Sequence, residues 1–221
     1  MSIQLYEMPF SPFCIPISRM LEAAGVEFER IDVPNWDRRP VIEITGGAYY
    51  QVPVLVHEGR VVFESAADSQ DVARYTDTTF CNGRFFPAGR DDEQAPLIQH
   101  FEDDLEGLTF KLTDVHYVPS IPDLGDRVMV IRHKERKFGA GCVELWTREA
   151  ESLRADLESK LAPLDARLKN PPFLLGEQPV YADFLLYGVL GNYTFNGWNA
   201  LPAHLTALKA WRQRMAEFRL D

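Results

Sequence analysis

A hydroxyl and a thiol stand three residues apart near the start of the chain, at Ser11 and Cys14. The loop that holds them, residues 9–14, reads Pro-Phe-Ser-Pro-Phe-Cys, between a strand-like run at 3–8 and an amphipathic run at 15–24. A helix N-terminus carries unpaired N–H groups and a partial positive charge, which stabilise a thiolate. The loop therefore predicts sulfur chemistry, on Cys14 itself or on a bound thiol.

A second group of candidate residues is Gln51-Val52-Pro53. A proline at the start of a strand is often only an edge feature. The functional interpretation is a cis bond between Val52 and Pro53, which is a minority state of such bonds. It would leave the Val52 N–H and C=O side by side, free to pair with an extended peptide. We expect this cis bond.

The third group is Glu64-Ser65, which we expect at the start of a helix that ends near Tyr75. Serine in that place is commonly an N-cap and nothing more. As ligand groups, the Ser65 hydroxyl and N–H would bind a carboxylate at the helix N-terminus, and Glu64 would bind an ammonium. An α-amino acid carries both charges, so the pair predicts a site for one.

The chain divides into two parts of different composition. Residues 1–79 give the order β-α-β-α-β-β-α, which predicts an α/β layer with a mixed sheet. Residues 80–89 contain turn signals and are assigned as a linker. Residues 90–221 are expected to be all helical, although prolines and glycines predict partly irregular structure over 118–141.

Within the helical part, the strongest period runs over 144–168, where apolar residues recur every three or four positions and predict a core-facing stripe. Residues 181–195 are apolar on all sides, which indicates a central buried helix. Pro202 is expected to begin a last helix.

Composition limits the partners and the cellular setting that the protein is expected to have. With 23 basic and 33 acidic residues the net charge is −10, which argues against nucleic acid or an anionic membrane as a partner. The cysteines, Cys14, Cys81 and Cys142, have no metal spacing and do not form a disulfide framework. No signal peptide and no apolar run near ~20 residues is evident, so a cytoplasmic setting is expected.

Taken in order, Ser11-Pro-Phe-Cys14, Val52-Pro-Val-Leu55, Glu64-Ser65 and Tyr181-Ala-Asp-Phe-Leu-Leu-Tyr187 resemble the motifs of the cytosolic glutathione transferases of serine type. The resemblance implies a thioredoxin-like α/β N-terminal domain followed by an all-α C-terminal domain. It also implies a homodimer, glutathione as cosubstrate, no metal, and a small hydrophobic electrophile as the second substrate, as in detoxification. Val180 departs from the pattern, because the family has Ser or Thr at that position.

The resemblance also assigns roles to residues. Ser11 is the catalytic residue that holds the glutathione thiolate. Arg38 or Arg39 is a candidate for the glycine carboxylate, because Gln51 stands near where a lysine often helps. The implied glutathione site comprises Gln51, Val52, Pro53, Glu64, Ser65 and Arg39. The implied second-substrate pocket, between the domains, comprises Phe13, His116, Tyr117 and Trp198.

Three functions remain open at this stage. The first is a transferase, with cleavage of ethers or thioethers as a subtype, in which Ser11 lowers the thiol pKa by ~2 units, or about 2.7 kcal/mol. A hydrogen bond to a charged group supplies roughly 1.5–3 kcal/mol, so one serine suffices. The second is a non-catalytic glutathione-binding module. The third is a disulfide reductase that uses Cys14, which otherwise is an inert buried thiol.

Overall fold

The N-terminal part is built on a mixed four-stranded sheet of order β2-β1-β3-β4, in a computed structural model that describes residues 2–66 and 69–221. The central strand β1 pairs with β2 in parallel and with β3 antiparallel, placing Leu5 opposite Leu55. Both side chains are fully buried. The strands are β1 (Ile3–Glu7), β2 (Glu29–Asp32), β3 (Val54–His57) and β4 (Arg60–Val62).

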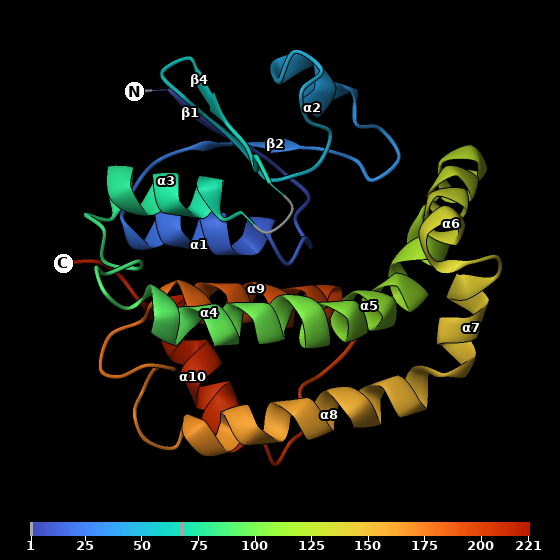
Figure 1. Ribbon diagram of the computed structural model, residues 1–221. Coiled ribbons are helices and arrows are strands. Elements are labelled where there is room, and N and C mark those ends of the chain that lie inside the picture. Colours follow the sequence, from blue (N-terminus) through green and yellow to red (C-terminus); the bar gives the residue numbers. More distant parts are fainter. Residues whose placement is uncertain (1, 67–68) are drawn as a thin grey trace.

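Three helices complete this part in the predicted order: α1 (Cys14–Ala23), α2 (Arg39–Ile44) and α3 (Asp71–Phe80). Helices α1 and α3 lie side by side, between the sheet and the C-terminal helices (Figure 1). The prediction that Ser65 opens the third helix is wrong. The helix begins at Asp71, because the Glu64 carboxylate accepts a hydrogen bond from the Asp71 N–H at 2.8 Å and satisfies the helix terminus there.

The C-terminal part is helical, so the predicted fold class, an α/β part followed by an all-α part, is confirmed. Helix α9 runs through the middle of the helical layer, beneath α1 (Figure 1). The helical segments are α4 (Asp91–His100), the π-turn η1 (Phe101–Leu105), α5 (Glu106–Ser120), α6 (Leu124–Phe138), α7 (Cys142–Arg148), α8 (Ala150–Arg167), α9 (Tyr181–Tyr193), the short 3₁₀ turn η2 (Phe195–Gly197) and α10 (Thr206–Glu217).

Some expected boundaries differ from the structure. Residues 118–141 are mostly helical: the Asp123 carboxylate caps the N-terminus of α6 by accepting from the Asp126 N–H at 2.9 Å, and Gly139, at φ 93°, ends the helix. The long period at 144–168 forms two helices, α7 and α8, that meet at Glu149. The last helix begins at Thr206, four residues after Pro202.

Helix α9 supports the Ser11 loop through close packing. A Cβ atom on Gly188 would lie 2.2 Å from the carbonyl oxygen of Pro12, and one on Gly191 would lie 2.9 Å from the Ile15 side chain. Glycine at these two positions therefore lets α9 approach the loop and the start of α1. The helix is buried on nearly all sides, as its composition predicts.

Polar contacts join the two parts as well. The Arg19 guanidinium on α1 donates from Nε to the Met215 carbonyl at 2.8 Å, and the Leu220 N–H donates to the Ala23 carbonyl at 2.7 Å. Both contacts connect α1 with the C-terminal end of the chain. The position of α1, and of the loop before it, is therefore fixed by both parts of the molecule.

The departure at Val180 leaves the Asp183 half of the capping motif in place, and the Asp183 N–H donates to the Val180 carbonyl at 2.9 Å. The buried Asp183 carboxylate accepts hydrogen bonds from the N–H groups of Val180 and Leu174 at 3.0 Å each and from the Trp211 indole at 2.8 Å. Burial raises the pKa of Asp183 to about 6.

In the part of the chain that the structure describes, no helix has the length and apolar character needed to cross a membrane.

Candidate functional site

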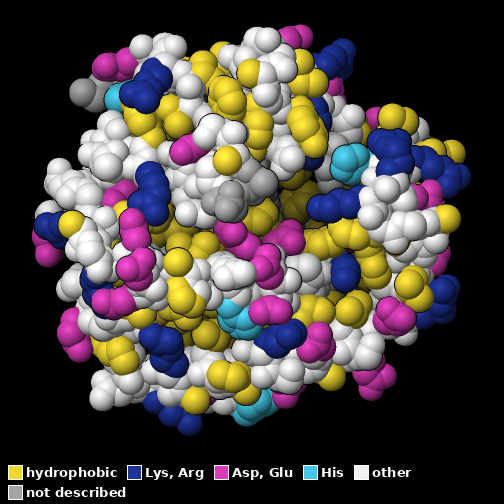
Figure 2. Space-filling model, in the orientation of Figure 1, with side chains coloured by type: hydrophobic (Ala, Val, Ile, Leu, Met, Phe, Trp, Pro, Cys, Tyr) yellow, Lys and Arg dark blue, Asp and Glu magenta, His cyan; other side chains and the backbone are white. Residues whose placement is uncertain are grey.

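A cleft of about 520 Å³ lies at the boundary between the two parts. Figure 2 shows it as a hollow bordered by hydrophobic, Lys or Arg, and His side chains, with Asp or Glu side chains below it. Its N-terminal wall comes from residues 8–13, 35–38 and 50–52, and its other wall from α5, α6 and Asn192 of α9. The lining residues are Met8, Phe10, Ser11, Pro12, Phe13, Asn35, Trp36, Arg38, Tyr50, Gln51, Val52, Glu106, Phe110, Asp114, Met129, His133, Lys134, Arg136, Lys137, Phe138 and Asn192.

Ser11 lies in the cleft wall, just before α1, and is 4% exposed. Its Oγ accepts hydrogen bonds from the N–H groups of Phe13 and Cys14, each at 3.3 Å. Because the oxygen acts as the acceptor in both bonds, the hydroxyl hydrogen can be donated, either to the adjacent Cys14 sulfur or to a ligand in the cleft. The geometry thus combines a helix terminus with one hydroxyl donor, an arrangement that stabilises an anion placed against it.

Cys14 is the first residue of α1 and is fully buried. Burial raises the pKa of its thiol to about 12, although Ser11 acts in the opposite direction through a side-chain hydrogen bond. A reactive cysteine requires a lowered pKa and access to its partner. Cys14 has neither, so its surroundings are those of an inert core thiol.

The predicted cis bond between Val52 and Pro53 is present. Gln51 and Val52 line the cleft, while Pro53 lies buried behind them. The pairing of β3 with β1 begins at Val54. Within the described residues the Val52 N–H and carbonyl take part in no backbone hydrogen bond, so both are available to an extended peptide.

Glu64 and Ser65 are engaged with the start of α3. The Glu64 carboxylate also accepts from the Ser69 hydroxyl at 2.5 Å, and its pKa is raised by burial. The Ser65 N–H and hydroxyl both donate to the Asp71 carboxylate, at 2.9 and 2.5 Å. A carboxylate of this chain thus lies where the sequence predicts the carboxylate of a ligand. Neither Glu64 nor Ser65 is among the residues that line the cleft.

Of the two arginine candidates, Arg38 lines the cleft and Arg39 does not. Arg39 is exposed and forms an ion pair with Asp37 at 2.5 Å. Arg38 donates from Nη2 to the Asn35 side chain at 2.8 Å, and its buried Nη1 has no hydrogen-bond partner among the described residues. Burial lowers the pKa of Arg38. Arg38 is therefore better placed than Arg39 to bind an anion in the cleft.

The four residues expected around a second substrate lie in different places. Phe13 lines the cleft. Tyr117 packs behind the wall, with its ring centroid 4.5 Å from that of Phe10. His116 and Trp198 are outside the lining residues; their rings stack on one another with centroids 6.1 Å apart. The structure thus brings only part of this set to the cleft.

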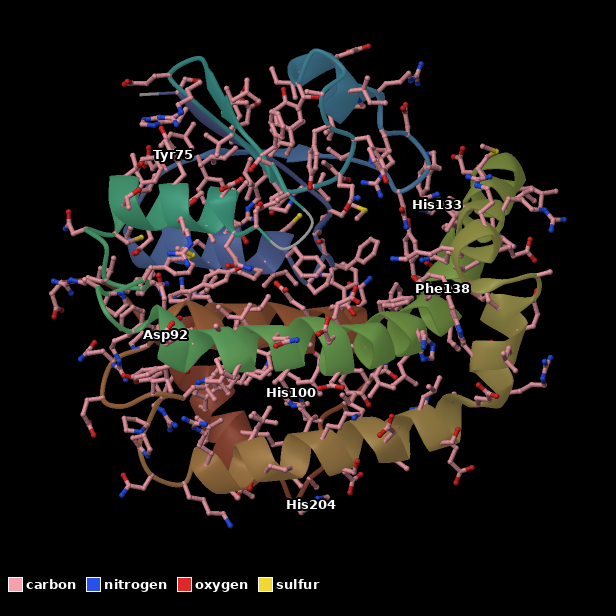
Figure 3. The ribbon with its side chains drawn as sticks, in the orientation of Figure 1. Tyr75, Asp92, His100, His133, Phe138 and His204 are labelled. Carbon is pink, nitrogen blue, oxygen red and sulfur yellow. The ribbon has the colours of Figure 1, made fainter. Side chains whose placement is uncertain are left out.

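Sequence reasoning missed Glu106 and Asp114 of α5 and the lining residues of α6. Those of α6 fall within residues 118–141, where it expected partly irregular structure. Helix α6 presents His133, Lys134, Arg136 and Lys137 to the cleft, which we call the basic face of α6. Figure 3 shows His133 and Phe138 on this helix, at the flank of the N-terminal part. The charged run 132–137 was a visible signal, but a run of charge is usually a solvated face.

Two acids lie opposite the basic face. Asp114 is 3% exposed and forms an ion pair with Lys134. Burial raises the pKa of Glu106 to about 7, against the opposing effect of Lys137. Among the described residues no group of three or more His, Cys, Asp or Glu side chains is placed to hold a metal ion.

Comparison with known proteins gives consistent matches. A model of the glutathione S-transferase N-terminal domain matches residues 5–82, and a model of the C-terminal domain of the same proteins matches residues 130–218. The glutathione S-transferase-like protein ustS of Aspergillus flavus is 26% identical over 181 residues, which cover 75% of this chain and 61% of that protein. The chain thus spans less than two thirds of that relative's length.

Solved structures share the fold across nearly the whole chain. A glutathione transferase of Phanerochaete chrysosporium is similar with a TM-score of 0.79 at 19% identity, covering 100% of this chain and 98% of its own. A glutathione S-transferase of Ceriporiopsis subvermispora, solved with glutathione, has a TM-score of 0.78 at 19% identity, covering 99% and 96%. Glutaredoxin 2 of Salmonella typhimurium, also solved with glutathione, has a TM-score of 0.74 at 20% identity, covering 98% and 94%.

Proposed function

Since the chain belongs to the glutathione S-transferase superfamily, we propose that it binds glutathione in the cleft and joins the intact molecule, through its sulfur, to an organic electrophile. The observation that carries this proposal is the position of Ser11, whose hydroxyl lies in the cleft wall just before α1 and can donate a hydrogen bond there. A thiolate placed there meets a hydroxyl donor and the partial positive charge of a helix terminus.

In the proposed reaction Ser11 stabilises the thiolate without becoming charged. The hydrogen bond to the sulfur contributes roughly 1.5–3 kcal/mol, and the helix terminus adds about 0.3–1 kcal/mol. Together they are large enough to lower the thiol pKa by ~2 units, which requires about 2.7 kcal/mol. The thiolate then forms a bond to the electrophilic carbon, and a leaving group, where there is one, departs with the electron pair of the broken bond.

For glutathione itself we propose contacts along the peptide. The free N–H and C=O of Val52 pair with its backbone, and Gln51 and Pro53 shape that edge. Glu64 binds the α-ammonium. The γ-glutamyl carboxylate binds Ser65, where it must displace the carboxylate of Asp71. Arg38 replaces Arg39 as our candidate for the glycine carboxylate.

The structure weighs differently on the two alternative functions, a disulfide reductase and a non-catalytic glutathione-binding module. A disulfide reductase needs Cys14 as a thiolate, and burial of that thiol, with a pKa of about 12, weighs against it. A non-catalytic glutathione-binding module is the remaining competitor. In either case we propose a homodimer, as the family resemblance implies, within the cytoplasm. The three cysteines, all unpaired and buried in the structure, are compatible with a reducing compartment.

The function is tested with the wild-type protein in two steps. Calorimetry should give saturable binding of glutathione, and absorbance should show its conjugation to 1-chloro-2,4-dinitrobenzene with release of chloride. Binding without conjugation of this compound, or of aryl ethers and epoxides, would favour the non-catalytic module. Absence of glutathione binding would reject the proposed function altogether. Light scattering at micromolar concentration distinguishes the dimer from a monomer.

A further inference from the structure

We propose that the second substrate is an amphipathic organic anion, an aromatic or otherwise apolar body that carries a carboxylate or sulfonate, and that the basic face of α6 binds its acidic group. The proposal rests on the proposed function, because it names the class of compound that the glutathione sulfur attacks in the same cleft. In the transfer step the acidic group changes no bond; it only holds the electrophile in place.

The apolar body has a place at the rim of the cleft. Among the large hydrophobic side chains that the structure exposes, Trp36 and Tyr50 from the N-terminal part and Met129 and Phe138 from α6 line the cleft. Their exposed fractions are 36%, 54%, 55% and 39%. Exposed hydrophobic side chains that gather at one hollow, from two separate walls, indicate a surface for an apolar ligand.

Among the described residues, acids balance the positive charge on the α6 side only in part. Asp114 is already paired with Lys134, and Lys134 lies 5.7 Å from the Phe110 ring. Arg136 and Lys137 form no ion pair with any residue in the described ranges. Glu106 faces them, but burial in the cleft wall raises its pKa to about 7, so it opposes their charge less than an ordinary carboxylate does at neutral pH. Two cations of α6 are thus available to a ligand.

The neighbours of His133 show the same positive field. Burial lowers the pKa of His133, and Arg136, Lys134, Arg38 and Lys137 lower it further. The molecule as a whole has a net charge of −10, so it repels anions except where basic groups are concentrated. In Figure 2 Lys or Arg and His side chains lie at one side of the hollow, next to hydrophobic ones, and Asp or Glu side chains lie below it.

Charge and apolar surface are close enough for one ligand to touch both. The Lys137 Nζ lies 5.1 Å from the centroid of the Phe138 ring. An aromatic acid that stacks on Phe138 would therefore bring its acidic group to within reach of Lys137. Glutathione does not need these cations in the proposed binding mode, because Arg38 stands on the opposite wall.

A matched pair of fluorescent probes tests the inference without turnover. The probes are 8-anilinonaphthalene-1-sulfonate and N-phenyl-1-naphthylamine, which has the same aromatic body and no sulfonate. Their affinities are measured with and without saturating glutathione, for the wild type, for R136M/K137M, and for R132M. Arg132 is the control, because it is on the same helix, pairs with Glu135 and does not line the cleft.

We expect the wild type to bind the sulfonate at least about tenfold more tightly than the neutral probe, with the difference shrinking between 0.05 M and 1 M salt as screening increases. R136M/K137M should remove most of that difference and leave the neutral probe within about twofold. R132M should behave as the wild type. Equal binding of the two probes by the wild type, or a sulfonate preference that survives in R136M/K137M, would overturn the inference.

Kinetics and calorimetry separate this inference from the function on which it rests. For 4-chloro-3-nitrobenzoate against its methyl ester, R136M/K137M should raise KM for the acid by about tenfold and leave kcat and the ester unchanged. The same variant should bind glutathione normally. If its glutathione affinity falls instead, α6 serves the first substrate and the inference is wrong. If the wild type fails to bind glutathione, the proposed function fails, while the probe pair still reports on anion binding by α6.

Discussion

The side-chain amide of Asn192 donates a hydrogen bond of 2.8 Å to the carbonyl oxygen of Phe10. Asn192 belongs to the buried helix α9, and Phe10 directly precedes Ser11. The carbonyl and side-chain oxygens of Asn192 also accept from the Thr113 hydroxyl on α5, at 2.9 and 3.3 Å. The catalytic loop proposed here is therefore held by the C-terminal helices.

This relationship predicts the effect of Asn192→Leu. The change removes the bond to Phe10 and should cost about 1–3 kcal/mol of unfolding free energy. Displacement of Ser11 should also lower kcat/KM by about tenfold or more. Thr113→Val is the matched control: it breaks the same network without touching Phe10, so it should lose stability and keep activity. Equal activity of the two variants would show that the loop does not depend on Asn192.

Close packing of α9 gives a second prediction. Gly188→Ala places a methyl group against the Pro12 carbonyl, and overpacking of this kind typically costs about 1–3 kcal/mol. Gly107→Ala in α5 meets no atom within 4 Å and should stabilise the protein by up to about 1 kcal/mol, because alanine is the better helix former. Urea unfolding of the two variants checks both signs. A stable Gly188→Ala protein would contradict the close approach.

Catalysis should depend on Ser11 rather than Cys14. Ser11→Ala should lower kcat by roughly tenfold to a hundredfold, from the loss of about 1.5–3 kcal/mol of hydrogen bonding to the sulfur. Its pH–rate profile should move upward as the thiol regains its ordinary pKa, with glutathione affinity nearly intact. Cys14→Ala should retain turnover. Stopped-flow absorbance of the thiolate at several pH values measures the shift directly, and the reverse ranking of the variants would favour the disulfide reductase.

Glu64 has two roles that one substitution can separate. Glu64→Gln keeps an oxygen that accepts from the Asp71 N–H and removes the negative charge proposed to bind the glutathione ammonium. Thermal unfolding should therefore change little, while glutathione affinity falls by about tenfold or more, as a lost charged hydrogen bond requires. Glu64→Ala should lose both affinity and stability. Calorimetry that gives wild-type affinity for Glu64→Gln would remove Glu64 from the binding site.

Glu106 predicts a pH dependence of stability. Its pKa of about 7 in the native state lies above the ordinary value of 4.5, so the native state holds the proton more tightly than the unfolded chain. The contribution of this protonation to the free energy of unfolding is full below pH 4.5 and is lost as the pH rises through 7. Relative to the wild type, Glu106→Gln should gain stability between pH 5 and 8, by at most about 3 kcal/mol. Urea unfolding at several pH values checks this, and a constant difference would contradict it.

The sequence by itself determined the fold class and the ordered motifs. Local periodicity and turn chemistry, which a single chain segment displays, determine three of these features. They are the strand, loop and helix at 3–24, the cis bond at Val52–Pro53, and the buried helix after Val180. The membership of the superfamily follows from the same local features. These features can be predicted from the sequence because each is determined by neighbours within a few residues.

Only the tertiary structure decided how the segments meet. Three features of the site depend on contacts that the sequence pattern does not display. Arg38 lies in the cleft while Arg39 lies outside it, Ser65 pairs with Asp71, and His116 stacks on Trp198. The basic face of α6 looks like a solvated charge run in the sequence. It becomes a wall of the cleft because packing turns it toward the N-terminal part, and the charge of a side chain matters for binding only once burial and neighbours are set.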